Sequence, residues 1–224
     1  MIVACNAGVV SRSPATAGVD HGEDWQVDHR ASVAADSEAG PPGLREQLDG
    51  LDRAVFRVIA ATPTPSLDRA FGMLSRAANH SKLWVATAAV LAASGASGRR
   101  AATDGLVAVA ATSAVINLVL KPMGERRRPG PAGDRVPVAR QVDMPESTSF
   151  PSGHSGSAFA FASAVGRSWP PAGGPIQALA TLVAYSRVHT GVHYPGDVIV
   201  GSTVGSVVGP LAGYAVQRWR RSRR

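Results

Sequence analysis

The chain of 224 residues contains a single cysteine, Cys5, and only 5% aromatic residues. One cysteine can form neither a disulfide framework nor a cysteine zinc site. The sequence also lacks a cluster of carboxylates of the kind that binds Mg²⁺ or Zn²⁺. We therefore expect no metal ion and no cofactor. The length is that of one domain of ordinary size.

Positive charge is in excess but is not spread along one face. The formal net charge is +7, yet residues 1–43 carry a net −4 and residues 44–224 a net +11. Five of the last seven residues are arginines. The basic residues sit in clusters between apolar segments, which is typical of membrane proteins and not of a nucleic-acid binder. We therefore expect no nucleic-acid partner.

Charged residues are almost absent from five successive stretches of 16 to 20 residues, namely 83–98, 101–120, 147–166, 168–186 and 198–217. A helix needs about 20 apolar residues to cross a bilayer. The five stretches predict an all-α integral membrane bundle of about five to six transmembrane helices, the sixth if residues 51–74 also cross. Within 168–186, the early prolines and glycines leave only the later part predicted as helix. The membrane-embedded core is predicted to cover residues 82–217.

The segments outside this core differ in character. Residues 1–43 show no sustained periodicity and are predicted to be a disordered tail. Residues 44–81 predict two short amphipathic helices, split by Pro63 and Pro65, that are interfacial or packed on the bundle. The basic tail 218–224 is expected at anionic lipid headgroups.

The short loops indicate an orientation in a cell membrane. Arg99, Arg100, Arg167 and the tail 218–224 fall on one side if the five stretches cross, and basic residues favour the cytoplasm. The C-terminus is then cytoplasmic. The segments 121–150 and 187–197 then lie on the extracytoplasmic side.

Glycines recur every four residues in the last stretch, at Gly201, Gly205, Gly209 and Gly213. Such a stripe lets helix backbones approach closely in lipid, although a tightly packed soluble helix can carry one too. The partner helix could belong to the same chain or to another, so the oligomeric state is not determined.

Three segments on the extracytoplasmic side carry unusual polar residues. Lys121, Arg128 and Arg187 would repel one another unless an anion with several oxygens joined them, and arginine suits two phosphate oxygens at once. Ser152 and Gly153 precede an apolar helix, where backbone N–H groups favour an anion. These residues predict a phosphate-binding site.

Two histidines and an aspartate complete the pattern. His193 and Asp197 are one helical turn apart, so the carboxylate can fix the imidazole tautomer and leave the other nitrogen free to attack phosphorus. His154 lies beside Ser152 and Gly153 and is suited to protonate the leaving oxygen. Arg126 and Arg127 are expected to meet lipid headgroups or solvent, although one of them could reach a second phosphate. No chemistry is assigned to His21, His29 or His80. His189 could touch the substrate but is read as a loop residue.

Taken together, Lys-x6-Arg-Pro from Lys121, Pro-Ser-Gly-His from Pro151, and Ser-Arg-x5-His-x3-Asp from Ser186 resemble the signature of the type 2 phosphatidic acid phosphatases, the PAP2 superfamily. The resemblance implies a metal-independent lipid phosphatase of actinobacterial type with an all-helical core. It implies His193 as nucleophile, Asp197 as its orienter and His154 as general acid and then base. Lys121, Arg128, Ser152, Gly153 and Arg187 would bind the phosphoryl group.

The expected substrate is a lipid phosphate monoester or diphosphate, such as phosphatidate, phosphatidylglycerol phosphate or a polyprenyl (di)phosphate. Vanadate-dependent haloperoxidases share the fold, but they are soluble and larger. A non-catalytic membrane protein that binds lipid phosphate remains an alternative, although binding alone needs no nucleophile. A soluble nucleic-acid binder would not need detergent for extraction.

Overall fold

The computed structural model describes residues 42–129 and 136–223. The helices are α2 (Leu44–Ala61), α3 (Pro65–Ala77), α4 (Lys82–Ala93), α5 (Ala96–Ala114), α6 (Gly153–Ser168), α7 (Pro170–His189) and α8 (Pro195–Ser222). Helix α5 continues through a π-helical turn, Val115–Leu120, and a 3₁₀ turn, Lys121–Met123. The described residues include no strand, which confirms the all-α prediction. The predicted tail, residues 1–43, lies almost wholly outside them.

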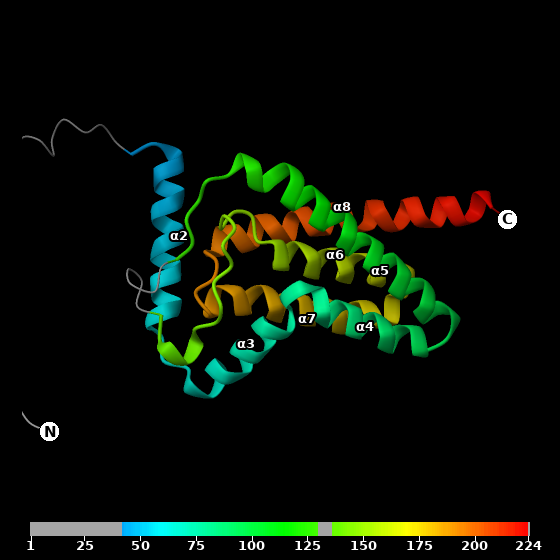
Figure 1. The fold of residues 1–224 in the computed structure, drawn as a ribbon, viewed down its shortest axis with the longest axis horizontal. Helices are drawn as coiled ribbons and strands as arrows, with labels where there is room; N and C mark the ends of the chain where they lie inside the picture. Colours follow the sequence, from blue (N-terminus) through cyan, green and yellow to red (C-terminus); the bar gives the residue numbers. More distant parts are fainter. Residues whose placement is uncertain (1–41, 130–135, 224) are drawn as a thin grey trace, which may run out of the picture. The chain divides into compact units, whose positions relative to one another are not determined.

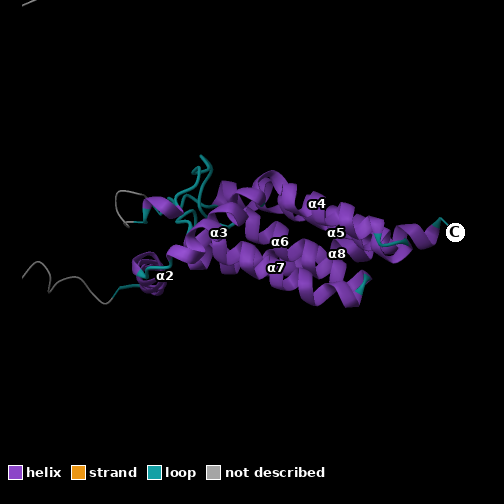
Figure 2. Cartoon of the chain, turned by 90° about the horizontal axis from the view of Figure 1, so that it is seen from below, coloured by secondary structure: helices purple, strands orange, loops and turns teal. Residues whose placement is uncertain are grey.

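Helix α6 is the centre of the bundle, packed against α5, α7 and α8 (Figure 1). Small residues make this close packing possible, since Ala158, Ala160 and Ala164 on α6 are almost completely buried. Phe161 of the same helix stacks near Trp84 of α4, with ring centroids 5.2 Å apart. Helix α2 lies across one end of the bundle, where Figure 2 shows it end-on.

Two of the described helical segments are long and apolar enough to cross a membrane, Ala96–Met123 and Pro195–Ser222, each of 28 residues. The number of five to six spanning helices therefore stays a prediction. The first apolar stretch, 83–98, is not one helix, because Gly95 adopts a φ of 98° and separates α4 from α5. With 12 residues, α4 is only about 18 Å long.

The early part of the fourth stretch also differs from the prediction. Helix α7 begins at Pro170 and includes Pro171, Gly173 and Gly174, which were expected to lie outside it. Proline is tolerated in the first helical turn because the N–H groups there have no helical acceptor. Gly173 lies against Gly166 of α6, so the missing side chains allow the two helices to approach.

The glycine stripe of α8 packs against α6 of the same chain. A Cβ atom on Gly205 would lie 2.1 Å from the carbonyl oxygen of Gly156, and one on Gly201 would lie 2.3 Å from that of Ser152. At Gly213 the nearest atom would be 3.8 Å away, an ordinary contact. The stripe thus sets the distance between α6, which begins at the predicted phosphate-binding residue Gly153, and α8, which begins between His193 and Asp197.

We expect Gly205→Ala to destabilise the protein by about 1–3 kcal/mol, because the added methyl group collides with a backbone that cannot move aside. Thermal unfolding in detergent, followed by circular dichroism, measures the effect. Gly213→Ala is the matched control on the same helix and should leave stability unchanged or slightly higher. Equal melting temperatures for the two variants would contradict this packing.

Candidate active site

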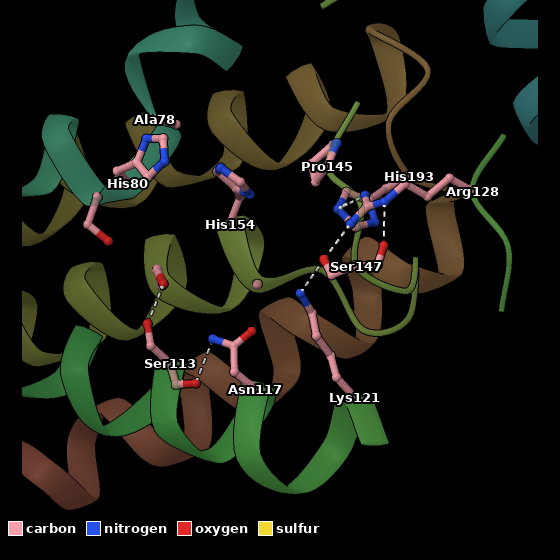
Figure 3. A pocket seen from close by; sticks show the side chains of 13 residues that line it. Ala78, His80, Ser113, Asn117, Lys121, Arg128, Pro145, Ser147, His154 and His193 are labelled. Atoms are coloured by element: carbon pink, nitrogen blue, oxygen red, sulfur yellow. Dashed lines mark hydrogen bonds between the residues drawn. The ribbon is translucent and has the colours of Figure 1, made fainter. Parts of the chain in front are cut away.

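The three predicted segments meet at the end of the bundle that α2 and α3 cover. They surround a cavity of about 150 Å³ (Figure 3). Of the predicted site residues, its wall includes Lys121, Arg128, Gly153, His154 and His193. Ser152, Arg187 and Asp197 are buried outside this wall. Residues far apart in the sequence therefore come together at one cavity, and their catalytic and binding roles stay predictions.

His193 is held with one ring nitrogen toward Arg128 and the other toward Asp197. Its Nε2 lies 3.0 Å from Arg128 Nη1. A guanidinium can only donate hydrogen bonds, so Nε2 accepts and carries a lone pair. The proton of the neutral ring is then on Nδ1, which lies 3.4 Å from Asp197 Oδ2, longer than a normal hydrogen bond. In this tautomer the lone pair of the neutral ring is on Nε2.

The surroundings of His193 keep it neutral. Burial has the largest effect and lowers the pKa of the imidazole. Asp197 opposes this change, whereas Arg128 and Arg187 lower the pKa further, to about 4. Near pH 7 the ring is therefore unprotonated, as a nucleophile must be.

Asp197 is fully buried in the first turn of α8 and is fixed by several donors. Its Oδ2 accepts from the backbone N–H of Tyr194, at 2.9 Å, and from the hydroxyl of Ser149. Its Oδ1 accepts from Arg126 Nη1, also at 2.9 Å. The carboxylate is thus held rigidly one helical turn from His193.

Arg126 corrects the sequence analysis, which placed it in solvent or at lipid headgroups. Besides Asp197, its guanidinium contacts Asp49 at 3.0 Å and Asp52 at 2.6 Å, both on α2. It also lies 4.4 Å from the centroid of the Tyr194 ring. Asp52 in turn accepts from the N–H of Gly196 at 2.7 Å. Arg126 therefore links α2 to the carboxylate beside His193.

The three predicted phosphate-binding cations are oriented by neutral oxygens. Lys121 donates to the Ser147 hydroxyl at 2.9 Å, and Arg128 donates to the carbonyls of Ser147 and Val192, each at 2.9 Å. Arg187, buried in α7, donates to the carbonyl and hydroxyl of Ser75 at 3.1 and 2.6 Å. Within the described part of the chain, no ion pair neutralises these cations.

Ser152 caps helix α6 and joins it to α8. Its Oγ accepts from the Ser155 N–H at 3.4 Å and lies 2.9 Å from the Ser155 hydroxyl. Its own N–H donates to the Asp197 carbonyl at 3.0 Å. These bonds place Gly153 and His154 at the cavity wall. Phosphate binding by Ser152 itself stays a prediction.

His154 has a partner that sequence reasoning missed. Its Nε2 lies 3.0 Å from Asn79 Oδ1, in the turn between α3 and α4. In this turn His80 and Ser81 both adopt positive φ, 54° and 58°, and both line the cavity. His80, to which no chemistry was assigned, therefore faces the site (Figure 3). Two successive residues with positive φ, both at the cavity wall, distinguish this turn from an ordinary connection between helices.

His189 does not line the cavity. It lies in the last turn of α7, where its Nε2 is 3.0 Å from Asp68 Oδ1 of α3. Arg140 donates to the same oxygen at 2.8 Å and to the carbonyl of Ile59 at 3.0 Å. This buried cluster fixes α3 and the loop before α6 to α7. His189 is thus a helical residue in the structure, where the sequence analysis read it as part of a loop.

Comparison with known proteins identifies the family. The profile of the PAP2 superfamily matches residues 102–221, more than half of the chain. The chain belongs to the PAP2 superfamily. This confirms the resemblance seen in the three motifs, all of which lie inside the matched region.

The relatives of this PAP2 protein include decaprenylphosphoryl-5-phosphoribose phosphatase of Mycobacterium tuberculosis. The two are 39% identical over 97 residues, which cover 43% of this chain and 51% of the relative. The chain thus spans about half the length of the curated relatives it matches.

Two solved structures share the fold of this PAP2 protein. Aquifex aeolicus LpxE is 24% identical, with a TM-score of 0.59 over 71% of this chain and 92% of that structure. The transmembrane PAP2 type phosphatidylglycerolphosphate phosphatase from Bacillus subtilis is 22% identical, with a TM-score of 0.58 over 84% and 92%. At these identities the two structures show a shared fold, and membrane insertion of this protein stays a prediction.

Proposed function

We propose that this PAP2 superfamily protein is a metal-independent phosphatase that hydrolyses a lipid phosphate monoester or diphosphate. One observation carries the proposal. A buried, neutral His193 lines the cavity with its Nε2 lone pair held by Arg128, beside cations that have no carboxylate partner among the described residues. A site for binding alone would need the cations but not a nucleophile fixed by a carboxylate.

The proposed reaction has two steps. His193 Nε2 attacks phosphorus, and the bond from phosphorus to the leaving oxygen breaks while His154 gives that oxygen a proton. A water molecule, deprotonated by His154, then attacks the phosphohistidine, the P–N bond breaks, and phosphate leaves. Lys121, Arg128 and Arg187 stabilise the charge on the equatorial phosphoryl oxygens in both transition states.

Arg128 Nη1 donates to the Nε2 lone pair of His193. A phosphoryl group must therefore take over the Arg128 hydrogen bond before attack can occur. This exchange is favourable because a charged phosphoryl oxygen is a stronger acceptor for a guanidinium than a neutral imidazole. Binding of the correct group thus frees the nucleophile.

A lipid substrate class is supported by two observations. The cavity opens at one end of a bundle that includes two long apolar helices, where a lipid-borne phosphate would be presented. The Mycobacterium relative is named as a phosphatase of a decaprenylphosphoryl sugar phosphate. We therefore place polyprenyl phosphates and diphosphates in the substrate class beside phosphatidate and phosphatidylglycerol phosphate.

The test is phosphate release by detergent-purified protein, with EDTA present, from a panel of lipid phosphates and diphosphates. We expect release from at least one member of the panel, and the ranking identifies the lipid. Folded protein that binds these lipids without releasing phosphate would instead support the non-catalytic alternative.

The acid side of the pH profile follows from the pKa of His193. Only the neutral ring can attack, so kcat/KM should fall as pH decreases through about 4, with no loss between pH 7 and 5 from this group. A phosphate monoester substrate itself titrates near pH 6. A phosphodiester-like analogue, or a comparison of variants, separates the ionisation of the substrate from that of His193. A His193-dependent loss of activity already at pH 6.5 would contradict the buried environment described above.

We also propose that the cavity is extracytoplasmic and that the C-terminus is cytoplasmic. The basic residues Arg100, Arg167 and Arg220 all line one pocket, at the ends of α5, α6 and α8 remote from the cavity, which is the arrangement that the positive-inside tendency favours. In a Cys5→Ser background, an impermeant maleimide should label Glu125→Cys in intact cells and Ser222→Cys only after lysis. The opposite labelling pattern would reverse the orientation.

A further inference from the structure

The end of the bundle remote from the catalytic cavity holds a second, basic pocket. Helix α5 begins there and helices α6 and α8 end there (Figure 1). The pocket has a volume of about 320 Å³. Its wall is formed by Arg100, Asp104, Arg167, Ser168, Gln217, Arg220 and Arg221.

One arginine of this pocket is neutralised and three are not. Asp104, buried in α5, lies 2.9 Å from Arg220 Nη1 and accepts from the Ser168 hydroxyl at 2.5 Å. The ion pairs of the described residues include none with Arg100, Arg167 or Arg221, whose side chains are exposed. The pocket therefore carries an excess of positive charge on a scaffold fixed by Asp104.

An apolar groove of about 540 Å³ adjoins the basic pocket and shares Arg220 with it. The groove runs between α5 and α8 and is lined by small or apolar side chains, among them Val107, Ala111, Ala215 and Trp219. Trp219 lies at the end of the groove near the arginines, and tryptophan is enriched where hydrocarbon meets headgroups.

We propose that this pair of cavities binds an anionic phospholipid, with the phosphate among the arginines and an acyl chain in the groove. Arginine forks match phosphate oxygens, and the adjoining Ala and Val side chains offer a hydrocarbon surface. The wall of the groove also includes Thr103, whose hydroxyl donates to the Arg99 carbonyl of its own helix, and Arg220 at the end shared with the basic pocket. A free phosphate would use the basic pocket but not the groove, whereas a phospholipid uses both. The site is separate from the catalytic cavity and does not depend on the proposed reaction.

The experiment measures binding of phosphatidylglycerol, against phosphatidylcholine with the same acyl chains, to the full-length protein in detergent by native mass spectrometry. Arg100→Gln combined with Arg167→Gln should weaken phosphatidylglycerol binding by about 30-fold, since each basic residue contributes a factor of about 5. Asp104 and Arg220 stay paired in this variant, so the fold is retained. Arg99→Gln with Arg218→Gln removes the same charge outside the pocket and should change binding less than about 3-fold.

Two further variants separate a specific site from general charge attraction. Ala215→Phe should fill the groove and weaken binding, while Val207→Phe, on an exposed part of α8 outside the groove, should not. Arg128→Ala, in the catalytic cavity, should leave phosphatidylglycerol binding intact. Equal losses in the two double variants, equal binding of the two lipids, or loss of binding in Arg128→Ala would each overturn the proposal. Absence of phosphatase activity would not affect it.

Discussion

Replacing His193 with alanine should lower phosphate release by at least about 10⁴-fold, because the substitution removes the proposed nucleophile. Loss of a nucleophile in other covalent enzymes costs up to about 10⁶-fold, with residual rate left by the groups that bind the transition state. The cations of this site would remain, so binding of the lipid phosphate should persist. Initial rates of phosphate release, with equilibrium binding on the same sample, measure the two effects separately.

Detection of phosphorylated protein during turnover is the control for this prediction. Rapid acid-free denaturation of wild-type protein during turnover of a ³²P-labelled substrate should trap label on the chain, and His193→Ala should trap none. His154→Ala should accumulate label when the leaving group needs no proton, because hydrolysis of the P–N bond then lacks its base. Release that survives in His193→Ala would disprove a phosphohistidine at this position.

Arg126→Gln should lower kcat by about 10²-fold although Arg126 does not line the cavity. Its guanidinium is the only basic group paired with Asp197 in the described structure apart from His193 itself. Without it, the buried carboxylate loses a 2.9 Å bond, and Asp49 and Asp52 of α2 lose their contacts with this cation. Asp49 keeps Arg53 at 3.9 Å. Residues that orient a reacting group typically contribute 10- to 100-fold.

Arg127→Gln is the matched control, since the adjacent exposed arginine has the same charge. A merely structural loss would lower the amount of folded protein but would not move the pH profile. Loss of the Arg126 cation beside Asp197 should strengthen the effect of that carboxylate, which raises the pKa of the His193 imidazole, so the acid limb of kcat/KM should shift to higher pH. Unchanged pH dependence together with an unchanged kcat would show that α2 and Asp197 are not coupled through Arg126.

The helices could be predicted from the sequence because lipid-facing and buried positions both exclude charge. The gaps between charged residues located α5, α6 and α8 within a few residues. The same criterion failed at 83–98, where an uncharged run hid the break at Gly95. It also failed at Pro170, because proline is disfavoured inside a helix but is well accommodated in the first turn. Hydropathy indicates which segments are buried. It does not indicate where a helix is interrupted, because an interruption depends on the dihedral angles of single residues.

Residues of the site could be predicted where their chemistry requires a fixed spacing or position along the chain. His193 and Asp197 had to be one helical turn apart, and His154 had to start a helix. Asn79, Asp49 and Asp52 carry no such constraint, because they reach the site from α2 and from the turn before α4 by tertiary contacts. The sole signal in the sequence was that Asp49 and Asp52 lie three residues apart on one helix face. Surface helices carry such pairs of acids routinely, so the pair did not indicate a site.

The sequence by itself determined the helical class, the three motifs and the chemistry they imply, since each depends on residue type and on spacing along the chain. Only the tertiary structure decided that the Gly201–Gly209 part of the glycine stripe packs on α6, that Arg126 holds Asp197, and that a basic pocket adjoins an apolar groove at the far end. These features join side chains separated by roughly 40 to more than 100 positions. Their pairing depends on how helices pack, which spacing along one chain does not encode.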